Sequence, residues 1–210
     1  MANKILNQQE RTSLDEGTLV LVAHPDLDES RVNAAWVEAL KRDGRTTVRV
    51  LADEIGPDGF DVHSEQQQLK RHKRIILQFP FHWYGPPPLL NQWLDEVLER
   101  GWAYGPGGNA LTGKFLSVAV TTWSRAHDYT YEGMYGVTLK ELLAPFRATA
   151  IRVGMEPNGH YALHGVGDRD DMEILNTADD YARWASRPQQ SLDNTDSSDL
   201  ATANRVSSGI

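Results

Sequence analysis

Apolar and polar residues follow a regular order along this chain, and that order limits the folds that it can adopt. Short, almost continuous apolar runs are separated by longer segments in which apolar residues recur at helical spacing. We predict strands at residues 18–23, 47–51, 74–79, 115–121 and 149–153. We predict helices at residues 30–42, 64–72, 89–100, 137–147 and 168–186. Apolar strands that alternate with helices indicate an α/β fold, in which helices cover both faces of a parallel sheet.

Few arrangements of these elements are compatible with right-handed crossover connections, and we expect a doubly wound sheet of five parallel strands. In an open parallel sheet, ligands bind beyond the carboxyl ends of the strands, near the point at which the strand order reverses. The loops that follow the first, third and fourth predicted strands are therefore the places where we expect a site.

The two ends of the chain differ from its middle. Residues 1–17 are mostly polar and show no sustained period, and residues 189–210 are rich in Ser, Asp, Asn and Thr and lack aromatic side chains. Segments of this kind bury too little apolar area to offset the entropy lost on ordering. We expect an N-terminal tail at residues 1–17, one domain at residues 18–188 and a disordered C-terminal tail at residues 189–210.

Charge and cysteine content exclude several classes of function. With 29 acidic and 21 basic side chains the formal net charge is −8, which argues against a nucleic-acid binder. The absence of cysteine excludes disulfides, thiolate metal sites and a cysteine nucleophile. No apolar run approaches the roughly 18–20 residues that span a bilayer, and residues 1–4 lack the apolar core of a signal peptide. We expect a soluble, cytoplasmic protein without membrane insertion.

The loop after the first predicted strand, residues 24–33, runs into the start of a helix. Helix N-termini present unpaired N–H groups and the positive end of the helix dipole, which suit a phosphate. Ser30 is placed to donate its hydroxyl to such a group, and His24 to face it. The alternative is that Ser30 only caps the helix, and the sequence does not decide between these two roles.

The loop after the third predicted strand, residues 80–88, interleaves aromatic residues with prolines. Prolines remove backbone freedom, and Phe81, Trp83 and Tyr84 offer flat apolar walls. This combination fits a planar heteroaromatic ligand, held also by exposed backbone amides. The alternative is a plug in the core or in a dimer interface.

The loop after the fourth predicted strand, residues 122–136, is long, polar and aromatic, as substrate-facing loops are. We predict no metal site there, because the adjacent side chains of His127 and Asp128 rarely converge on one ion. Residues 108–114 match the pattern GxxxxGK, but Phe115 and a strand follow instead of Ser or Thr and a helix, so we reject a nucleoside-triphosphate site. The dinucleotide pattern GxGxxG and the nucleophile pattern GxSxG are absent.

Four segments of the sequence resemble one family. They are AHP and SRVN within residues 23–33, FPFHWYGPPPLLNQWLDEVL at 79–98, GWAYGPGGNALTGK at 101–114, and PFRATAIRVGM at 145–155, before His160 and His164. The chain is similar over residues 18–184 to the flavodoxin-like NAD(P)H:quinone oxidoreductases. The shorter bacterial branch, which includes general-stress oxidoreductases and ancillary subunits of glutathione-gated potassium efflux systems, is the most similar.

This resemblance implies a flavodoxin-like fold with strand order 2-1-3-4-5, bound FMN or alternatively FAD, and a homodimer with the flavin at the subunit interface. It also implies hydride transfer from NAD(P)H through flavin N5 to a quinone or similar acceptor. An alternative is a regulatory subunit docked on a membrane transporter, with incidental reductase activity. A one-electron carrier is a third alternative, against which the chain length and the aromatic second loop argue.

The resemblance also assigns roles to residues by position. Tyr129 matches a tyrosine expected to steady the reduced flavin or donate a proton, and Tyr135 lies where some relatives have histidine, so both are expected to act in catalysis. The residues expected to hold the flavin are His24, Ser30, Val32, Asn33, Pro80, Phe81, His82, Trp83, Tyr84, Thr121, Thr122, Trp123 and Ser124.

One departure from the family pattern stands in the third loop. The family usually reads Thr-Thr-Gly-Gly, whereas this chain reads Thr121-Thr122-Trp123-Ser124. Glycines let the backbone approach a ring closely and adopt positive φ. We expect Trp123 either to stack beside the flavin or to swing away, and its presence to narrow the substrate pocket or weaken flavin affinity.

Overall fold

The structure is a computed structural model, and it describes residues 17–187. Apart from Gly17, the two predicted tails lie outside the described residues. Within residues 17–187, no helix combines the length and the apolar character that crossing a membrane requires.

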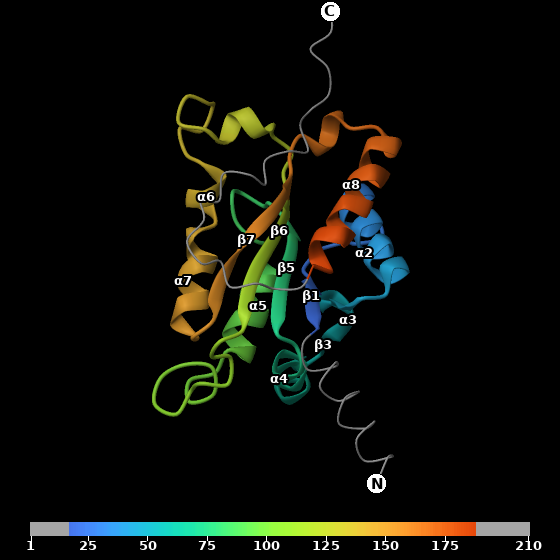
Figure 1. Cartoon of the computed structure of the whole chain (residues 1–210). Coiled ribbons are helices and arrows are strands. Elements are labelled where there is room, and N and C mark those ends of the chain that lie inside the picture. Colours follow the sequence, from blue (N-terminus) through green and yellow to red (C-terminus); the bar gives the residue numbers. More distant parts are fainter. Residues whose placement is uncertain (1–16, 188–210) are drawn as a thin grey trace, which may run out of the picture.

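The sheet has five parallel strands in the order β2-β1-β5-β6-β7 (Figure 1). Counted along the chain among these five strands, the order is 2-1-3-4-5, which confirms the expected doubly wound topology. The strands are β1 (Thr18–Val22), β2 (Thr46–Val50), β5 (Arg74–Pro80), β6 (Phe115–Thr121) and β7 (Glu156–Leu163).

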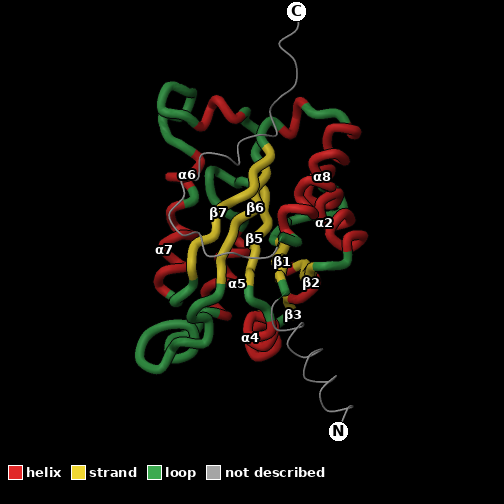
Figure 2. Tube along the Cα trace, in the orientation of Figure 1, coloured by secondary structure: helices red, strands yellow, loops and turns green. Residues whose placement is uncertain are grey.

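Helices cover both faces of this sheet, as Figure 2 shows. On one face lie α2 (Arg31–Asp43) and α8 (Asp171–Ala185), and on the other lie α4 (Val62–Arg71), α5 (Pro88–Val97) and α7 (Ala144–Arg152). The inner strand β1 serves both cores because its side chains alternate. Leu19 and Leu21 join the core under α5, while Val20 and Val22 join the core under α2 and α8.

The fifth strand was predicted in the wrong place. Residues 149–152 are the end of α7, and the strand is β7, which begins at Glu156. The β-branched residues near position 150 favoured a strand, but Phe146 and Ala150 are buried on one side while Ile151 is exposed, as on a helix. Strand β7 gives no apolar signal because it is an edge strand that contains Pro157 and stays partly exposed.

The last helix was also predicted to begin too early. It starts at Asp171, and its N-cap is Asp170, whose carboxylate accepts a hydrogen bond from the Glu173 N–H at 2.8 Å. Asp168 instead ends a short 3₁₀ helix, η2 (Val166–Asp168). The helix predicted at residues 137–147 is two helices, α6 (Leu139–Leu142) and α7, because Pro145 starts a new helix in its first turn.

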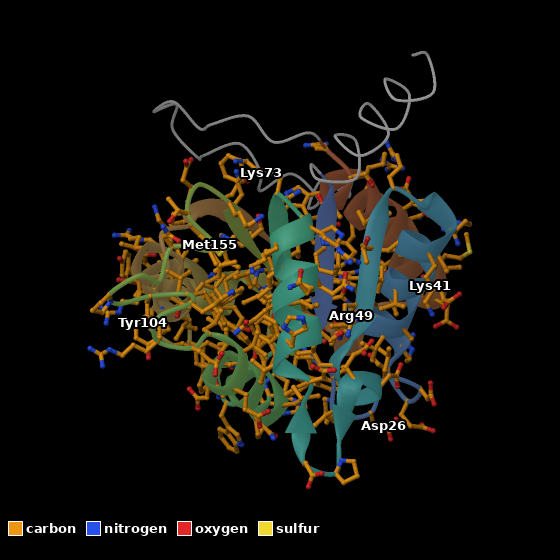
Figure 3. The ribbon with its side chains drawn as sticks, turned by 90° about the horizontal axis from the view of Figure 1, so that it is seen from below. Asp26, Lys41, Arg49, Lys73, Tyr104 and Met155 are labelled. Carbon is orange, nitrogen blue, oxygen red and sulfur yellow. The ribbon has the colours of Figure 1, made fainter. Side chains whose placement is uncertain are left out.

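Some elements were not predicted at all. A short helix, α3 (Leu51–Glu54), follows β2 directly, and a small hairpin joins β3 (Ile55–Gly56) to β4 (Gly59–Phe60). Beneath them Arg49, labelled in Figure 3, forms ion pairs with Glu54 at 2.6 Å and with buried Glu65 at 2.5 Å. This cluster anchors the amphipathic helix α4 to the sheet edge.

Candidate functional site

Three loops meet at the carboxyl edge of the sheet. Strands β1, β5 and β6 are parallel neighbours, so the loops that follow them leave the same edge. Two bonds tie these loops together at Thr121. The Asn33 side-chain amide donates to the Thr121 hydroxyl at 3.1 Å, and the Phe81 N–H donates to the Thr121 carbonyl at 2.9 Å. The structure therefore brings together the segments that the sequence singled out.

The first loop presents hydrogen-bond donors around the start of α2. Ser30 is the N-cap, and its Oγ accepts a hydrogen bond from the Asn33 N–H at 3.1 Å. The hydroxyl proton of Ser30 is not used in this bond, so the cap role and donation to an anion are compatible. The N–H groups of Arg31 and Val32, in the first turn, have no intrahelical acceptor. This end of α2 suits a phosphate.

His24 adds a further donor beside this helix end. Its Nδ1 accepts a hydrogen bond from the Asp26 N–H at 3.1 Å, which places the proton of the neutral ring on Nε2. Burial lowers the pKa of His24, and the charge of His82 in the second loop lowers it further. The first two loops are thus close enough to interact electrostatically.

A buried chain of polar side chains lies beneath the first loop. The Gln78 amide nitrogen approaches both the carbonyl and the side-chain oxygen of Asn33 at 3.3 Å, and the Tyr181 hydroxyl donates to the Gln78 side-chain oxygen. Sequence reasoning missed these two supporting residues. The available signal was a single amide, Gln78, inside an otherwise apolar predicted strand, because a buried amide needs partners.

The second loop contains a tight turn with an unusual backbone. His82 and Gly85 exchange N–H···O bonds of 2.9 and 3.1 Å, and between them Trp83 and Tyr84 have φ values of 49° and 65°. Left-handed conformations are strained for residues with a Cβ, and such strain is concentrated at functional sites. Trp83 is 94% exposed and Tyr84 41%, so neither ring plugs the core. Of the three aromatic residues in this loop, only Phe81 packs against core residues.

The third loop gathers hydroxyl and aromatic side chains. The Thr122 hydroxyl donates to the Ser124 carbonyl at 2.8 Å and lies 2.8 Å from Nδ1 of His164. The Ser124 and Tyr135 hydroxyls are 2.5 Å apart. The Tyr129 ring lies 5.1 Å from the ring of Tyr135 and 5.3 Å from that of His164. His164, which follows β7, was named only as part of a resemblance, and the structure places it against Tyr129.

Burial and hydrogen bonding act in opposite directions on Tyr129. Burial raises the pKa of its hydroxyl, whereas hydrogen bonds with the hydroxyls of Thr122 and Ser124 lower it. Burial also lowers the pKa of His164 to about 4, so the ring is neutral near pH 7. Because the Thr122 proton is given to the Ser124 carbonyl, neutral His164 donates its Nδ1 proton to Thr122.

Trp123 leans on the loop before α8. A Cβ atom built on Gly167 would lie 2.7 Å from the Trp123 ring, so the ring rests directly on this glycine of η2. Trp123 is 79% exposed. Neither Trp123 nor Ser124 has a positive φ, so both residues replace the glycines of the family pattern without backbone strain. The ring is directed to η2.

The remaining candidates in the loops have structural partners. The Asp128 carboxylate accepts a hydrogen bond from the Arg125 N–H at 2.9 Å, which closes η1 (Ala126–Tyr129). Among residues 17–187, no group of three or more His, Asp or Glu side chains is arranged to hold a metal ion. In the GxxxxGK segment, the Lys114 ammonium donates to the Lys70 and His72 carbonyls. It does so at the start of β6, on the edge opposite the three loops.

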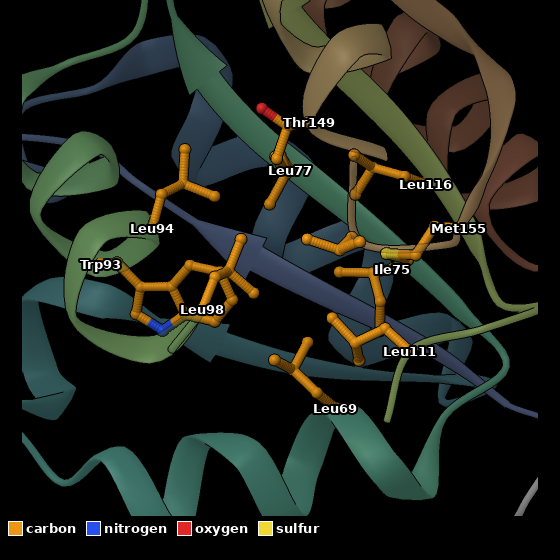
Figure 4. A pocket seen from close by; sticks show the side chains of 11 residues that line it. Leu69, Ile75, Leu77, Trp93, Leu94, Leu98, Leu111, Leu116, Thr149 and Met155 are labelled. Carbon is orange, nitrogen blue, oxygen red and sulfur yellow. The ribbon is translucent and has the colours of Figure 1, made fainter. Parts of the chain in front are cut away.

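Two hollows lie under the face that carries α5 and α7. One is an apolar cavity of about 20 Å³, lined by residues such as Leu69, Trp93 and Met155 (Figure 4). It is the size of about one water molecule, too small for a substrate. The other is a cleft of about 440 Å³ between α5 and α7, where Arg152 lies 4.9 Å from the Tyr104 ring centroid. Neither hollow is lined by residues of the three loops.

Known proteins resemble this chain in sequence and in fold. An uncharacterised NAD(P)H oxidoreductase of Bacillus subtilis, YdeQ, is 43% identical over 166 residues, which are 79% of this chain and 84% of that protein. The potassium-efflux ancillary protein KefG of Yersinia pseudotuberculosis is 33% identical over 171 residues, 81% of this chain and 93% of KefG.

Two solved structures extend this similarity. A general stress protein 14 of Treponema denticola, in complex with FMN, has a TM-score of 0.78 and 36% identity, and the match covers 82% of this chain and 99% of that one. An NADPH-quinone reductase of P. pentosaceus has a TM-score of 0.72 and 31% identity, with 80% and 97% covered. The family model described as Flavodoxin-like fold matches residues 16–185. This chain therefore belongs to the flavodoxin-like fold family.

Proposed function

We propose that this protein is an FMN-dependent oxidoreductase that takes two electrons, as a hydride, from NAD(P)H and passes them to a quinone or a similar acceptor. The observation that carries the proposal is the meeting of a donor-rich helix end, an exposed aromatic turn and a hydroxyl-rich loop at one edge of the sheet. The FMN complex of the general stress protein supports the cofactor, and the named activities of the relatives support the reaction.

The donor set of the described residues fits FMN. Ser30, His24 and the N–H groups of Arg31 and Val32 would hold a single terminal phosphate, as helix N-termini do. The N–H groups of Trp123 and Ser124 have no acceptor within the described residues, so they are available to the polar edge of a ring system. We propose flavin contacts for the full set His24, Ser30, Val32, Asn33, Pro80, Phe81, His82, Trp83, Tyr84, Thr121, Thr122, Trp123 and Ser124.

When bound, FMN would supply the hydride acceptor and donor, and the protein would supply orientation and protons. The strained turn at Trp83 and Tyr84 would hold the backbone of the second loop along the ring. Tyr129, whose pKa burial raises, would keep its proton near neutral pH and remain a hydrogen-bond donor at the site. We propose Tyr129 and Tyr135 as the residues that face the reacting groups.

We also propose that the protein is a homodimer with the flavin at the interface. Trp83 and Met134 are 94% and 79% exposed beside the proposed site. A second subunit that covered these two side chains would remove their apolar surface from water. Light scattering after gel filtration tests the association, and a monomeric mass at working concentration would refute it. The resemblance favours a cytoplasmic location, where NAD(P)H is available.

To test the cofactor, the purified protein is titrated with FMN. NADH or NADPH is then added under anaerobic conditions. We expect saturable quenching of flavin fluorescence, bleaching of the yellow absorption by the nicotinamide, and recovery on addition of 1,4-benzoquinone. Chromatography of the released flavin separates FMN from FAD. A protein that binds neither flavin, or whose bound flavin neither nicotinamide reduces, contradicts the proposal.

The similarity to KefG supports a second candidate, a regulatory subunit docked on a transporter. In this case reductase activity would be incidental. The second candidate is favoured if the protein co-purifies with membranes that contain the transporter. This co-purification should be lost when detergent extracts the transporter from those membranes. Full quinone reductase activity without any membrane association favours the first.

A further inference from the structure

Two helices that pack side by side, α2 and α8, begin next to each other (Figure 1). Arg31 is the first residue of α2 and Asp171 is the first residue of α8, and Nη2 of Arg31 donates to the Asp171 carboxylate at 2.7 Å. The same nitrogen donates to the Arg169 carbonyl at 3.1 Å. The start of α8 is therefore held against the helix end at which we propose that the FMN phosphate binds.

The two helix ends differ in the donors that they leave free. The N-cap of α2 is Ser30, and the first turn of this helix contains no acidic residue. The N-cap of α8 is Asp170, whose carboxylate accepts the Glu173 N–H at 2.8 Å, while the Glu173 carboxylate accepts the Asp170 N–H at 3.0 Å. This capping box uses backbone N–H groups that an anion would otherwise bind. The start of α2 thus favours an anion, and the start of α8 does not.

Carboxylates flank both helix ends along the chain. Seven exposed acidic residues lie in the loop before α2 and in residues 168–173: Asp26, Asp28, Glu29, Asp168, Asp170, Asp171 and Glu173. The arginines among them are already bonded. Arg125 pairs with Asp168 at 2.8 Å. Arg169 donates to the His164 carbonyl at 3.0 Å, and Arg31 is held by the two bonds described above.

This distribution of charge matters for the choice between two flavins. FAD carries a second phosphate and an adenosine beyond the phosphate that it shares with FMN. The two phosphates are joined through one oxygen atom, so the second must lie next to the first. Beside the start of α2 it would meet carboxylates, and the guanidinium of Arg31 is already engaged by one of them. Like charges at short range repel, so the position suits a single terminal phosphate.

We propose that Asp171 makes this site selective for FMN over FAD. The inference rests on the proposed function and adds a specificity-determining residue to it. Asp171 acts in two ways, because it engages the Arg31 guanidinium that a second phosphate would need and because its own carboxylate repels that phosphate. It takes no part in the transfer of electrons.

Calorimetric titrations with FMN and with FAD test this selectivity in the purified full-length protein, after removal of any bound flavin. For the wild type we expect the dissociation constant for FAD to exceed that for FMN by roughly tenfold or more. For Asp171→Asn we expect FAD to bind about three- to tenfold more tightly, since one repulsive charge is lost and Arg31 is released. FMN binding should change less than about twofold, because exposed charges farther from its phosphate are screened.

A second ion pair between the same two helices supplies the matched control. Arg42, in the last turn of α2, pairs with Asp179 of α8 at 2.5 Å. Asp179→Asn therefore removes the same charge and an equivalent bond farther along both helices, and we expect it to leave both dissociation constants unchanged. Arg31→Gln breaks the same pair as Asp171→Asn but leaves the carboxylate free, so FAD binding should weaken relative to FMN binding. Opposite shifts in these two variants separate an effect of charge from a loosened contact.

The proposal is overturned if the wild type binds FAD as tightly as FMN, or if Asp171→Asn leaves the ratio of the two dissociation constants unchanged. It is also overturned if Asp179→Asn or Arg31→Gln favours FAD as Asp171→Asn does, since that result indicates a general loosening of the two helices. Failure of the proposed function is a different result, in which the wild-type protein binds neither flavin.

Discussion

The Tyr181 hydroxyl donates a hydrogen bond of 3.0 Å to the side-chain oxygen of Gln78, and both side chains are fully buried. This bond joins α8 to the central strand β5. The nitrogen of the same amide faces Asn33 in the first turn of α2, and the Asn33 side chain donates a hydrogen bond to the Thr121 hydroxyl. The buried Gln78 amide therefore couples the packing of α8 to the geometry of the proposed phosphate site.

Tyr181→Phe removes the donor to Gln78 and leaves a buried amide oxygen unsatisfied. We expect a loss of about 1–3 kcal/mol in the free energy of unfolding, measured by urea denaturation. We also expect weaker FMN binding, because Gln78 then holds Asn33 less firmly. Tyr161→Phe is the control, since its hydroxyl donates to the Thr177 carbonyl and does not reach Gln78. An unchanged urea midpoint for Tyr181→Phe contradicts this account.

Ser30 has two separable roles. Ser30→Ala removes the cap of α2, and we expect a loss of about 1 kcal/mol in unfolding free energy. Ser30→Asp keeps a capping oxygen but places a carboxylate where a phosphate is proposed. For this variant we expect near-normal stability and FMN affinity reduced roughly tenfold or more, because like charges repel at short range. Equal FMN affinities for Ser30→Asp and the wild type would show that the FMN phosphate does not bind at this helix end.

The half-buried ring of His164 predicts acid sensitivity with a defined sign. Its folded-state pKa is about 4, below the ordinary value of 6.5, because burial disfavours the charged ring. The unfolded chain binds the proton first, so stability is full above pH 6.5 and falls as the pH drops toward 4. The full loss amounts to about 3 kcal/mol.

His164→Asn keeps a donor near Thr122 but does not titrate. We expect its unfolding free energy to fall less steeply than that of the wild type over this acid range. His127→Asn, which alters an exposed histidine of the same loop cluster, is the control and should follow the wild-type slope. Parallel curves for His164→Asn and the wild type would show that burial does not hold the ring neutral.

The contact between Trp123 and Gly167 predicts an effect on acceptor binding. Gly167→Ala places a methyl group within 2.7 Å of the Trp123 ring, and this exposed ring moves because it is a side chain. We expect less than about 0.5 kcal/mol change in stability, as for other surface sites. We expect the KM for a bulky quinone to change more than kcat. In a Trp123→Gly background the same alanine should have no effect, and a persistent effect there excludes the contact as its cause.

The sequence predicted the parts of the fold that bury apolar side chains at a regular period. Strands β1, β5 and β6 are covered on both faces, so apolar runs mark them to within a residue. Strand β7 lies at the sheet edge and contains Pro157 and Gly159, so periodicity could not show it. Two-residue strands such as β3 and β4 are too short for any period to appear.

For the candidate site, the sequence identified the loops but not the bonds between them. Ser30 and Phe81 were expected because each follows a predicted strand at the ligand-binding edge, whereas Tyr129 was expected only from the family resemblance. The bonds from Asn33 to Thr121 and from His164 to Thr122 join residues 88 and 42 positions apart. Such pairings depend on how strands are ordered in space, which a single sequence specifies only indirectly.

The turn from His82 to Gly85 has a consequence for binding. Turns with two consecutive residues at positive φ are usually made by Asn-Gly, which adopt this conformation at low cost. With Trp83 and Tyr84 in these positions, folding itself fixes two large rings toward solvent. Their backbone entropy is already lost before any ligand or second subunit arrives. The turn is therefore preorganised, and whatever binds these rings retains more of its contact energy as affinity.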